Sequence, residues 1–589
     1  MSLNDFCLTK FSFTVPLIRA ISPNLDNDIE RADMRIYPQA YAAKVGFFFI
    51  ISLVAAVAAI PLLVTVFGLE NLVFFMSLLA VPFVVLLVGS YMPSFSASSR
   101  ASSLEAEVPF AAAYITVMST GGISPFQSLQ MLKSVKLLPN LAKMSRELDI
   151  DVSGLGVDPV TAIEHKARNL PAPEFRELML GYASTLRSGG DVVHFLMRRT
   201  QLMFDERLSK TRLVGERASV LMEIYITVGV LLALGLYSIF AVSESMSEFM
   251  PSMFSGAFLV LFSYVLLPMT SYIFLWMADV MQPKYPQSDE RVYKTFYACM
   301  PVMIFLLVAF FVVFLLPQLR VIPLFDMSAK LIETLTAYFK LEKGFEASIG
   351  LCLAFLIPTL PAAVLEIESS ARERGIEFGI SNFLRDLVEI RKSGLSPEKC
   401  VTTLSARNYG RLTPYLKVMA RQLGWGLSFR RIYVHFERSV KSWLSRITMF
   451  LLLDTIHVGG GTPETLETLA QFSEDILRME KEKRSSLRPL LIVPYIGAGI
   501  LIIFTILFLS FSKYTLSLAG KSLGTSYLLQ LLIPPLVFHV YNMGLVAGKI
   551  SSEKVSAGFK HAAALTAFAL IALLFSPAYQ WQIAPPAGM

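Results

Sequence analysis

The sequence has few of the residues that metal binding, disulfide formation or catalysis needs. Only four cysteines occur among 589 residues, and no two of them form a CxxC pair, which argues against a zinc site or a disulfide framework. The six histidines form neither an HExxH motif nor a pair spaced by four residues. No nucleophile stands beside a matching base or acid. We therefore expect a protein that is not an enzyme and that binds no metal or cofactor.

Signatures of nucleotide and nucleic-acid binding are also missing. The tripeptide Gly520-Lys521-Ser522 resembles the end of a phosphate-binding loop, but Thr515 stands where the first glycine of that loop belongs. A basic stripe with interleaved aromatic residues on a soluble domain is not found, so we expect no nucleic-acid partner. The net charge of +7 is what a membrane protein with basic cytoplasmic loops would carry.

Nine long stretches of the chain are apolar and carry little charge. Hydrophobic residues make up 54% of the chain, and the mean hydropathy is +0.57. Each stretch is long enough to cross about 30 Å of hydrocarbon. We predict an all-α polytopic membrane protein with about nine transmembrane helices, at residues 45–67, 72–91, 220–242, 254–278, 295–317, 347–366, 489–511, 526–547 and 561–577.

These predicted spans lack carboxylates or cations near their centres. Ion-coupled transporters place ionisable groups at that depth, so secondary transport is disfavoured. His539 is the one intramembrane candidate for a functional role, and a hydrogen-bonded packing role is the simpler interpretation.

The distribution of basic residues predicts the orientation in the membrane. With the N-terminus in the cytoplasm, most of the 52 lysines and arginines are cytoplasmic. The uncharged C-terminus is then external, and the protein is a multi-pass protein of the cell (cytoplasmic) membrane. The basic residues left outside are Arg320, Lys330, Lys340, Lys343, Lys513 and Lys521.

A polar segment occurs twice, which indicates a duplicated helical module. Gly122, Ser124 and Pro125 in the first copy return as Gly394, Ser396 and Pro397 in the second, at an offset of 272 residues. A serine before a proline suits the start of a helix, because the serine can cap it and the proline needs no hydrogen-bond donor there. A second glycine turn follows in each copy, at Gly190 and Gly460. These glycines are expected to end the preceding helices and to set helix geometry rather than to touch a ligand.

The repeats and spans together predict six parts. They are a cytoplasmic N-terminal segment (1–44), two transmembrane helices (45–91), a first cytoplasmic helical module (92–219), four transmembrane helices with an external loop at 318–346 (220–366), a second cytoplasmic module (367–488) and three transmembrane helices (489–589).

Two basic groups in the second module are candidate contact surfaces. Arg430 and Arg431, with Arg438 and Lys441 nearby, form its densest basic helix face. The run from Glu480 to Arg484 precedes the next span. A solvated face, a surface turned to lipid headgroups and a contact with an acidic partner all remain open for these groups.

The order of motifs resembles the F-domain family of type II secretion systems, and most closely the FlaJ/TadC-like platform proteins of archaeal type IV pili and archaella. The second module carries the stronger match, through the segments 383–387, 393–394, 409–413, 422–426, 459–461 and 480–484. The first module matches more loosely, at 107–109 and 121–122.

This resemblance implies a non-enzymatic platform in the lipid bilayer. Its partners would be a cytoplasmic hexameric secretion ATPase, pilin or archaellin subunits, and a second copy of the chain in a homodimer. The candidate ATPase contacts carried over by charge and position are Arg430, Arg431, Lys481, Lys483 and Arg484. The alternative is a membrane permease subunit of an ATP-driven exporter, which the size of the two cytoplasmic modules makes less suitable.

Overall fold

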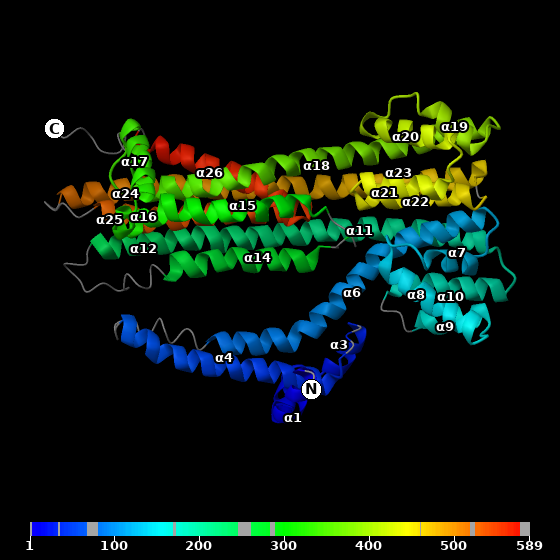
Figure 1. Ribbon diagram of the computed structural model, residues 1–589, viewed down its shortest axis with the longest axis horizontal. Coiled ribbons are helices and arrows are strands. Elements are labelled where there is room, and N and C mark those ends of the chain that lie inside the picture. The colour runs from blue at the N-terminus through cyan, green and yellow to red at the C-terminus, as the bar shows by residue number, and fades with distance from the viewer. Residues whose placement is uncertain are drawn as a thin grey trace. The chain divides into compact units, whose positions relative to one another are not determined.

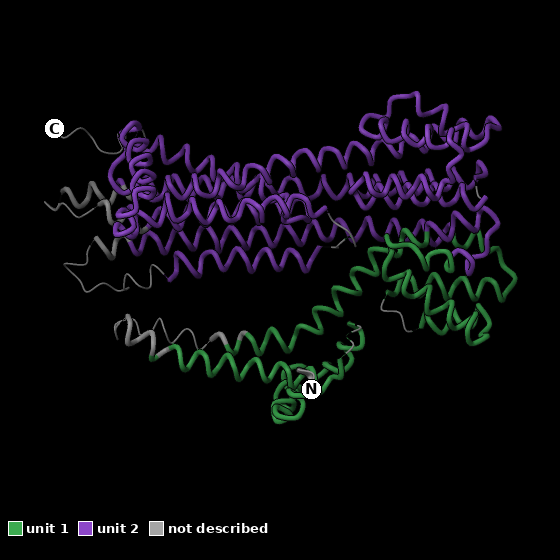
Figure 2. Tube along the Cα trace, viewed as in Figure 1, with its two compact units in different colours: residues 1–112, 129–196, 284–286 green, residues 113–128, 197–283, 287–589 purple. Residues whose placement is uncertain are grey.

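The computed structural model describes residues 3–32, 34, 36–67, 80–168, 172–245, 261–282, 285, 289–459, 461–518 and 525–577. Regular structure across these ranges is helical throughout, which confirms the all-α prediction. The chain divides into two compact units (Figures 1 and 2). Unit 1 comprises 1–112, 129–196 and 284–286, and unit 2 comprises 113–128, 197–283 and 287–589. The first predicted module is therefore shared between the two units, whereas the second lies in unit 2 alone.

Unit 1 joins a membrane hairpin to a set of short helices. Tyr41 at the start of its first long helix donates a hydrogen bond of 2.8 Å to the carbonyl of Gly89 on the second. The helices that precede the hairpin pack their apolar residues, among them Ile18 and Leu25, against the same contact. The helices that belong wholly or partly to this unit are α1 (Leu3–Lys10), α2 (Val15–Ile21), α3 (Leu25–Arg31), α4 (Pro38–Phe67), α6 (Ala80–Thr120), α7 (Pro125–Leu132), α8 (Pro139–Asp149), η4 (Ile150–Gly154), α9 (Pro159–Arg168), α10 (Pro173–Arg187) and the first turn of α11 (Val192–Ile226).

Unit 2 is built from long helices that share one apolar core, with the second module's short helices at one end (Figure 1). Its membrane helices beyond α11 are η5 (Thr227–Leu232), α12 (Ala233–Ser245), η6 (Phe262–Leu266), α14 (Leu267–Met281), α15 (Arg291–Leu307), η7 (Val308–Val312), α16 (Val313–Leu315), α18 (Glu346–Lys392), α24 (Ile492–Leu518), α25 (Thr525–Ser552) and α26 (Gly558–Leu574). The loop at 318–346, which the sequence predicts to be external, holds most of η8 (Pro317–Val321) and all of α17 (Pro323–Tyr338). The second module holds α19 (Pro397–Leu404), η9 (Gly410–Leu412), α20 (Thr413–Gly424), α21 (Phe429–Ser439), α22 (Trp443–His457) and α23 (Pro463–Leu487), with η10 (Arg488–Leu491) before α24 and η11 (Val555–Ala557) before α26.

Seven helical stretches of the described chain are long and apolar enough to cross a membrane. They overlap seven of the nine predicted spans. Of the other two, 72–91 lies partly outside the described residues, and 526–547 falls on α25, where the side chains of 525–528 and 531 lie outside them. The chain is a multi-pass membrane protein.

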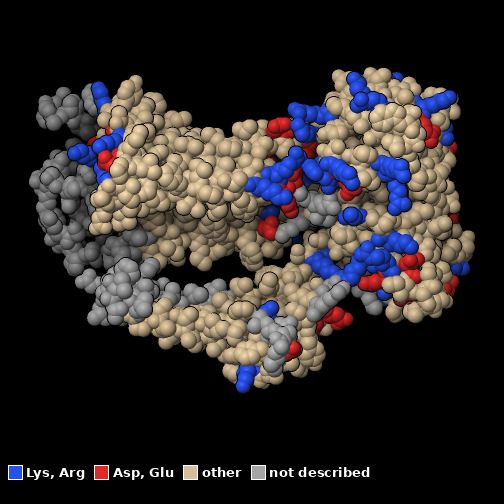
Figure 3. Space-filling view, in the orientation of Figure 1, with Lys and Arg blue, Asp and Glu red and all other residues tan. Residues whose placement is uncertain are grey.

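The duplication is visible as two matching series of helices. α7 and α19 have eight residues each and start 272 residues apart, and α10 and α22 have fifteen residues each. In each series a long helix leads into the module, and another long helix, α11 or α23, leads out of it. On the face drawn in Figure 3, charged side chains lie at the left end of the upper body and across its right half, and an uncharged band lies between these two regions. A band of that kind is what a hydrocarbon layer requires.

Candidate functional site

The first glycine turn of each module has the same geometry. Gly122 and Gly394 adopt φ values of +85° and +89°, a region that other residues rarely occupy. After each turn a serine caps the next helix. Ser124 Oγ accepts a hydrogen bond from the Gln127 amide at 3.2 Å, and Ser396 Oγ accepts one from the Lys399 amide at 3.4 Å. Pro125 and Pro397 are the first residues of α7 and α19.

In the second glycine turn of each module, the first glycine of the run has the left-handed conformation. Gly189, with φ +70°, and Gly459, with φ +98°, take this conformation. Gly190 follows Gly189 and donates to the Thr185 carbonyl at 2.9 Å, which closes the end of α10. Gly460 lies outside the described residues. Asp191 and Thr462 then cap α11 and α23.

A buried carboxylate holds the module-one helices of unit 1 together. Glu107 on α6 is fully buried, and its Oε2 accepts hydrogen bonds from the backbone amides of Asn140 and Leu141 at 3.1 and 3.0 Å. Asn140 Nδ2 donates to the same carboxylate at 2.7 Å. Glu107 thus satisfies the open end of α8 from a different helix. Burial raises the pKa of Glu107 to about 7, although these hydrogen bonds act to lower it.

In module two, the corresponding contact between helices involves no charged side chain at the position equivalent to Glu107. Position 379, which is 272 residues after Glu107, is a glycine. A Cβ atom there would lie 2.7 Å from the Tyr409 carbonyl oxygen and 2.7 Å from Leu412 Cβ. The chain before α20 therefore packs directly on α18 at Gly379, where module one inserts a carboxylate.

The two repeats meet within unit 2 through an unusual polar contact. The Tyr114 hydroxyl on α6 donates a 2.7 Å hydrogen bond to Asp454 Oδ2 on α22. The ring of Tyr114 also stacks on Phe450, with 5.8 Å between centroids. Burial is the main reason that the pKa values of both Tyr114 and Asp454 are raised. One further stacked pair, Phe204 on α11 and Phe472 on α23, joins the helices that leave the two modules.

Three of the five candidate ATPase contacts are exposed. Arg430 and Arg431 lie on α21, whose opposite face buries Ile432 and Phe436. Lys481 is exposed on α23. The side chains of these three cations are therefore accessible to solvent.

The other two candidates hold the protein itself together. Lys483 keeps only 13% of its side chain exposed, and its ammonium contacts Glu480 at 2.7 Å and Glu553 at 2.9 Å. Arg484 contacts Glu377 on α18 at 3.3 Å. The run from Glu480 to Arg484 is therefore mainly an internal network that joins α18, α23 and the segment after α25. Local sequence carries no signal for it, because Glu377 and Glu553 are far away in the chain.

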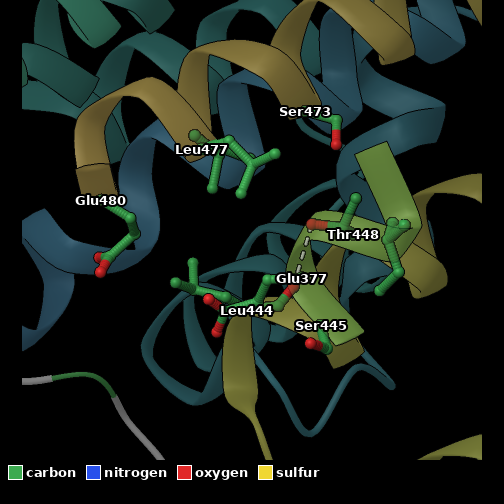
Figure 4. A pocket seen from close by; sticks show the side chains of 9 residues that line it. Glu377, Leu444, Ser445, Thr448, Ser473, Leu477 and Glu480 are labelled. Atoms are coloured by element: carbon green, nitrogen blue, oxygen red, sulfur yellow. Dashed lines mark hydrogen bonds between the residues drawn. The ribbon is translucent and has the colours of Figure 1, made fainter. Parts of the chain in front are cut away.

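The small cavity beside this network has room for about one water molecule. Its volume is about 10 Å³, and Glu377, Ser445, Ser473 and Glu480 are among the side chains around it (Figure 4). Ser445 Oγ is buried there without a hydrogen-bond partner in the described structure. A nucleotide or an organic cofactor would not fit. In the described residues no group of three or more His, Cys, Asp or Glu side chains is arranged to hold a metal ion.

His539 is buried in the membrane part of unit 2 among other polar groups. Its Nδ1 lies 3.5 Å from Ser271 Oγ, which is 3.0 Å from the Tyr225 hydroxyl. Its neighbour Asn542 is also buried, and neither atom of its amide group has a partner in the described structure. The sequence identified His539 as the intramembrane candidate, and the structure adds these three residues to it.

The comparison with protein families explains the two matching series of helices. The family model for type II secretion system (T2SS), protein F, matches residues 111–240 and again residues 383–510. The chain thus has two regions similar to this family, called here the first and second F domain, which together make up less than half of its length. Each F domain begins inside the long helix that enters a module and ends inside the apolar span that follows the module. Members of this family are non-catalytic membrane platform proteins of type II secretion and type IV pilus systems.

A relative that aligns with most of this chain comes from Methanocaldococcus jannaschii. It is 22% identical over 481 residues, which cover 79% of this chain and 75% of the relative, and it is itself described as uncharacterized. No solved structure matches the chain.

Proposed function

We propose that this chain is the integral membrane platform of an archaeal type IV filament assembly machine, either a pilus or an archaellum. It would couple a cytoplasmic hexameric secretion ATPase to the insertion of pilin or archaellin subunits into the filament. The observation that carries the proposal is the pair of F domains, each joined by a long helix to the membrane. The relative from the archaeon Methanocaldococcus jannaschii, which aligns over 79% of this chain, supports the archaeal assignment.

The proposed ATPase contact is a surface of Arg430, Arg431 and Lys481. All three side chains are exposed, and an acidic surface on the ATPase would be attracted to them. Lys483 and Arg484 would stabilise this surface indirectly, because their ion pairs hold α23, the helix that carries Lys481, in place. In this arrangement the N-terminus is cytoplasmic and the C-terminus is external, and a homodimer would present two such surfaces.

Deletion of the gene in its host tests the proposal directly. We expect one class of surface filament to disappear from electron micrographs, and a swimming assay would separate an archaellum from a pilus. Complementation with the intact gene is the control. A full set of filaments in the deletion strain would contradict the proposal and would favour the exporter alternative.

The ATPase contact has its own test. The double variant Arg430→Glu/Arg431→Glu should weaken binding of the purified ATPase by about tenfold or more, because two attractive charges become repulsive. The matched control is Lys417→Glu/Arg421→Glu, which reverses two exposed cations on the neighbouring helix α20. Equal binding by both double variants would remove Arg430 and Arg431 from the contact.

A further inference from the structure

Three cations from three different elements gather where unit 2 enters the membrane. Arg374 lies on α18, Arg488 begins η10 and Lys560 lies in the first turn of α26. Two of them stand one residue before the predicted spans 489–511 and 561–577, and Arg374 lies about two turns beyond the span 347–366. All three therefore sit near the predicted cytoplasmic border of the hydrocarbon layer.

Neighbouring contacts show that these elements are packed together. Arg484 pairs with Glu377 at 3.3 Å, which brings the residues one turn away on each helix, Arg488 and Arg374, toward each other. Next to Lys560, the Tyr495 hydroxyl lies 2.9 Å from His561 Nδ1 and so ties α24 to α26. Lys560 lies in the electrostatic field of both arginines, and Arg374 lies in that of Arg488.

The carboxylates around this border are already engaged. Glu377 pairs with Arg484, and Glu373 contacts Lys554 at 3.0 Å. Within the described part of the chain, neither Arg374, Arg488 nor Lys560 forms an ion pair. Glu366 is the one further carboxyl that acts on Lys560, and it is itself buried. Glu366 and Glu377 also act on Arg374, so Arg374 and Lys560 share Glu366, and Glu377 is already paired with Arg484.

We propose that Arg374, Arg488 and Lys560 form a binding site for the phosphate of an anionic phospholipid headgroup in the cytoplasmic leaflet. The depth of the site favours a lipid, because phospholipid phosphates lie at this border of the bilayer. The chemistry also fits. Guanidinium groups bind phosphate oxygens with paired hydrogen bonds, and a lysine adds a compact charge. Arg374 is held in place for this role by a 3.0 Å hydrogen bond from its Nε to the Ser370 carbonyl.

A bound lipid would join the second module to the last span of the chain. Arg374 belongs to the helix that enters the module, whereas Lys560 belongs to the C-terminal span. The lipid site requires only that the chain spans the membrane as predicted. A test of this site is therefore independent of whether the chain belongs to a filament machine.

Native mass spectrometry of the full-length protein tests the site. The protein would be reconstituted in nanodiscs of equal parts phosphatidylglycerol and phosphatidylcholine, extracted in mild detergent and scored for retained lipid. We expect the unaltered protein to retain phosphatidylglycerol, and the variant R374Q/R488Q/K560Q to retain about tenfold less. The matched control K399Q/K417Q/R421Q removes three exposed cations from α19 and α20 and should retain as much as the unaltered protein.

Two further measurements make the outcome decisive. The single variant Arg488→Gln changes one exposed side chain and should show a partial loss, which covers the case in which the triple variant does not fold. An excess of inorganic phosphate during extraction should leave the lipid in place. Equal loss in the site and control variants, equal retention of phosphatidylcholine, or displacement by inorganic phosphate would each overturn the proposal.

Discussion

Tyr114 and Asp454 are 340 residues apart in the chain, yet a 2.7 Å hydrogen bond joins their side chains. Tyr114 belongs to the first F domain and Asp454 to the second. The bond is partly buried, and Asp454 has a raised pKa because burial disfavours its charge. The two copies of the domain are therefore linked by a polar contact that depends on a phenol donor.

Removing that donor should destabilise the link. Tyr114→Phe keeps the ring that stacks on Phe450 but leaves Asp454 without its short hydrogen bond. We expect a loss of about 1–3 kcal/mol in the free energy of unfolding, visible as a lower Tm of the purified protein. Asp454→Asn and the double variant complete a thermodynamic cycle. Strictly additive effects of the two substitutions would show that the bond contributes no coupling energy.

Glu107 should make the contact between α6 and α8 depend on pH. Its pKa is about 7 in the folded protein, against about 4.3 in an unfolded chain. The folded state thus binds the proton more tightly, so stability is fully present below about pH 4.3 and falls as the pH rises through 7. The difference across this window is about 4 kcal/mol.

The measurement is the hydrogen-exchange protection of the α8 amides at pH 5.5 and pH 8, corrected for the intrinsic exchange rate. Protection should be higher at pH 5.5 in the unaltered protein. Glu107→Gln keeps an oxygen that can accept the amide hydrogen bonds and should remove most of the difference. Persistence of the full difference in this variant would assign the pH dependence to another group.

Lys483 and Lys481 are two residues apart on the same helix and should respond very differently to loss of charge. Lys483→Met leaves Glu480 and Glu553 without the ammonium that they share, and we expect a loss of about 3–5 kcal/mol. Lys481→Met changes an exposed side chain and should alter stability by about 0.5 kcal/mol or less. Thermal unfolding of both variants in the same detergent is the measurement. Similar Tm values for the two would show that the internal network contributes little.

Local sequence signals were sufficient for much of the fold. Long apolar runs predicted helices such as α15 and α26, and the Ser-Pro pairs at 124–125 and 396–397 stand where α7 and α19 begin. Such signals work because capping and span length depend on residues close together in the chain.

Contacts between distant helices were not predictable in this way. Nothing near Glu107 indicates that it caps α8, and nothing near Asp454 indicates a tyrosine from the other repeat. The charge run at 480–484 reads as a solvated face until Glu377 and Glu553 are placed beside it. Pairing of this kind is decided by tertiary packing, which one sequence does not reveal.

The unbroken course of α18 has a mechanical consequence. It runs 47 residues from Glu346 to Lys392, just before the Gly394 turn, a length of about 70 Å. A straight rod of hydrogen-bonded backbone resists twisting and bending much more than a chain with a hinge. A torque applied to the second F domain would therefore be transmitted along α18 to its Glu346 end as a rotation. Pro358 and Pro361 are the positions inside the helix where it can bend.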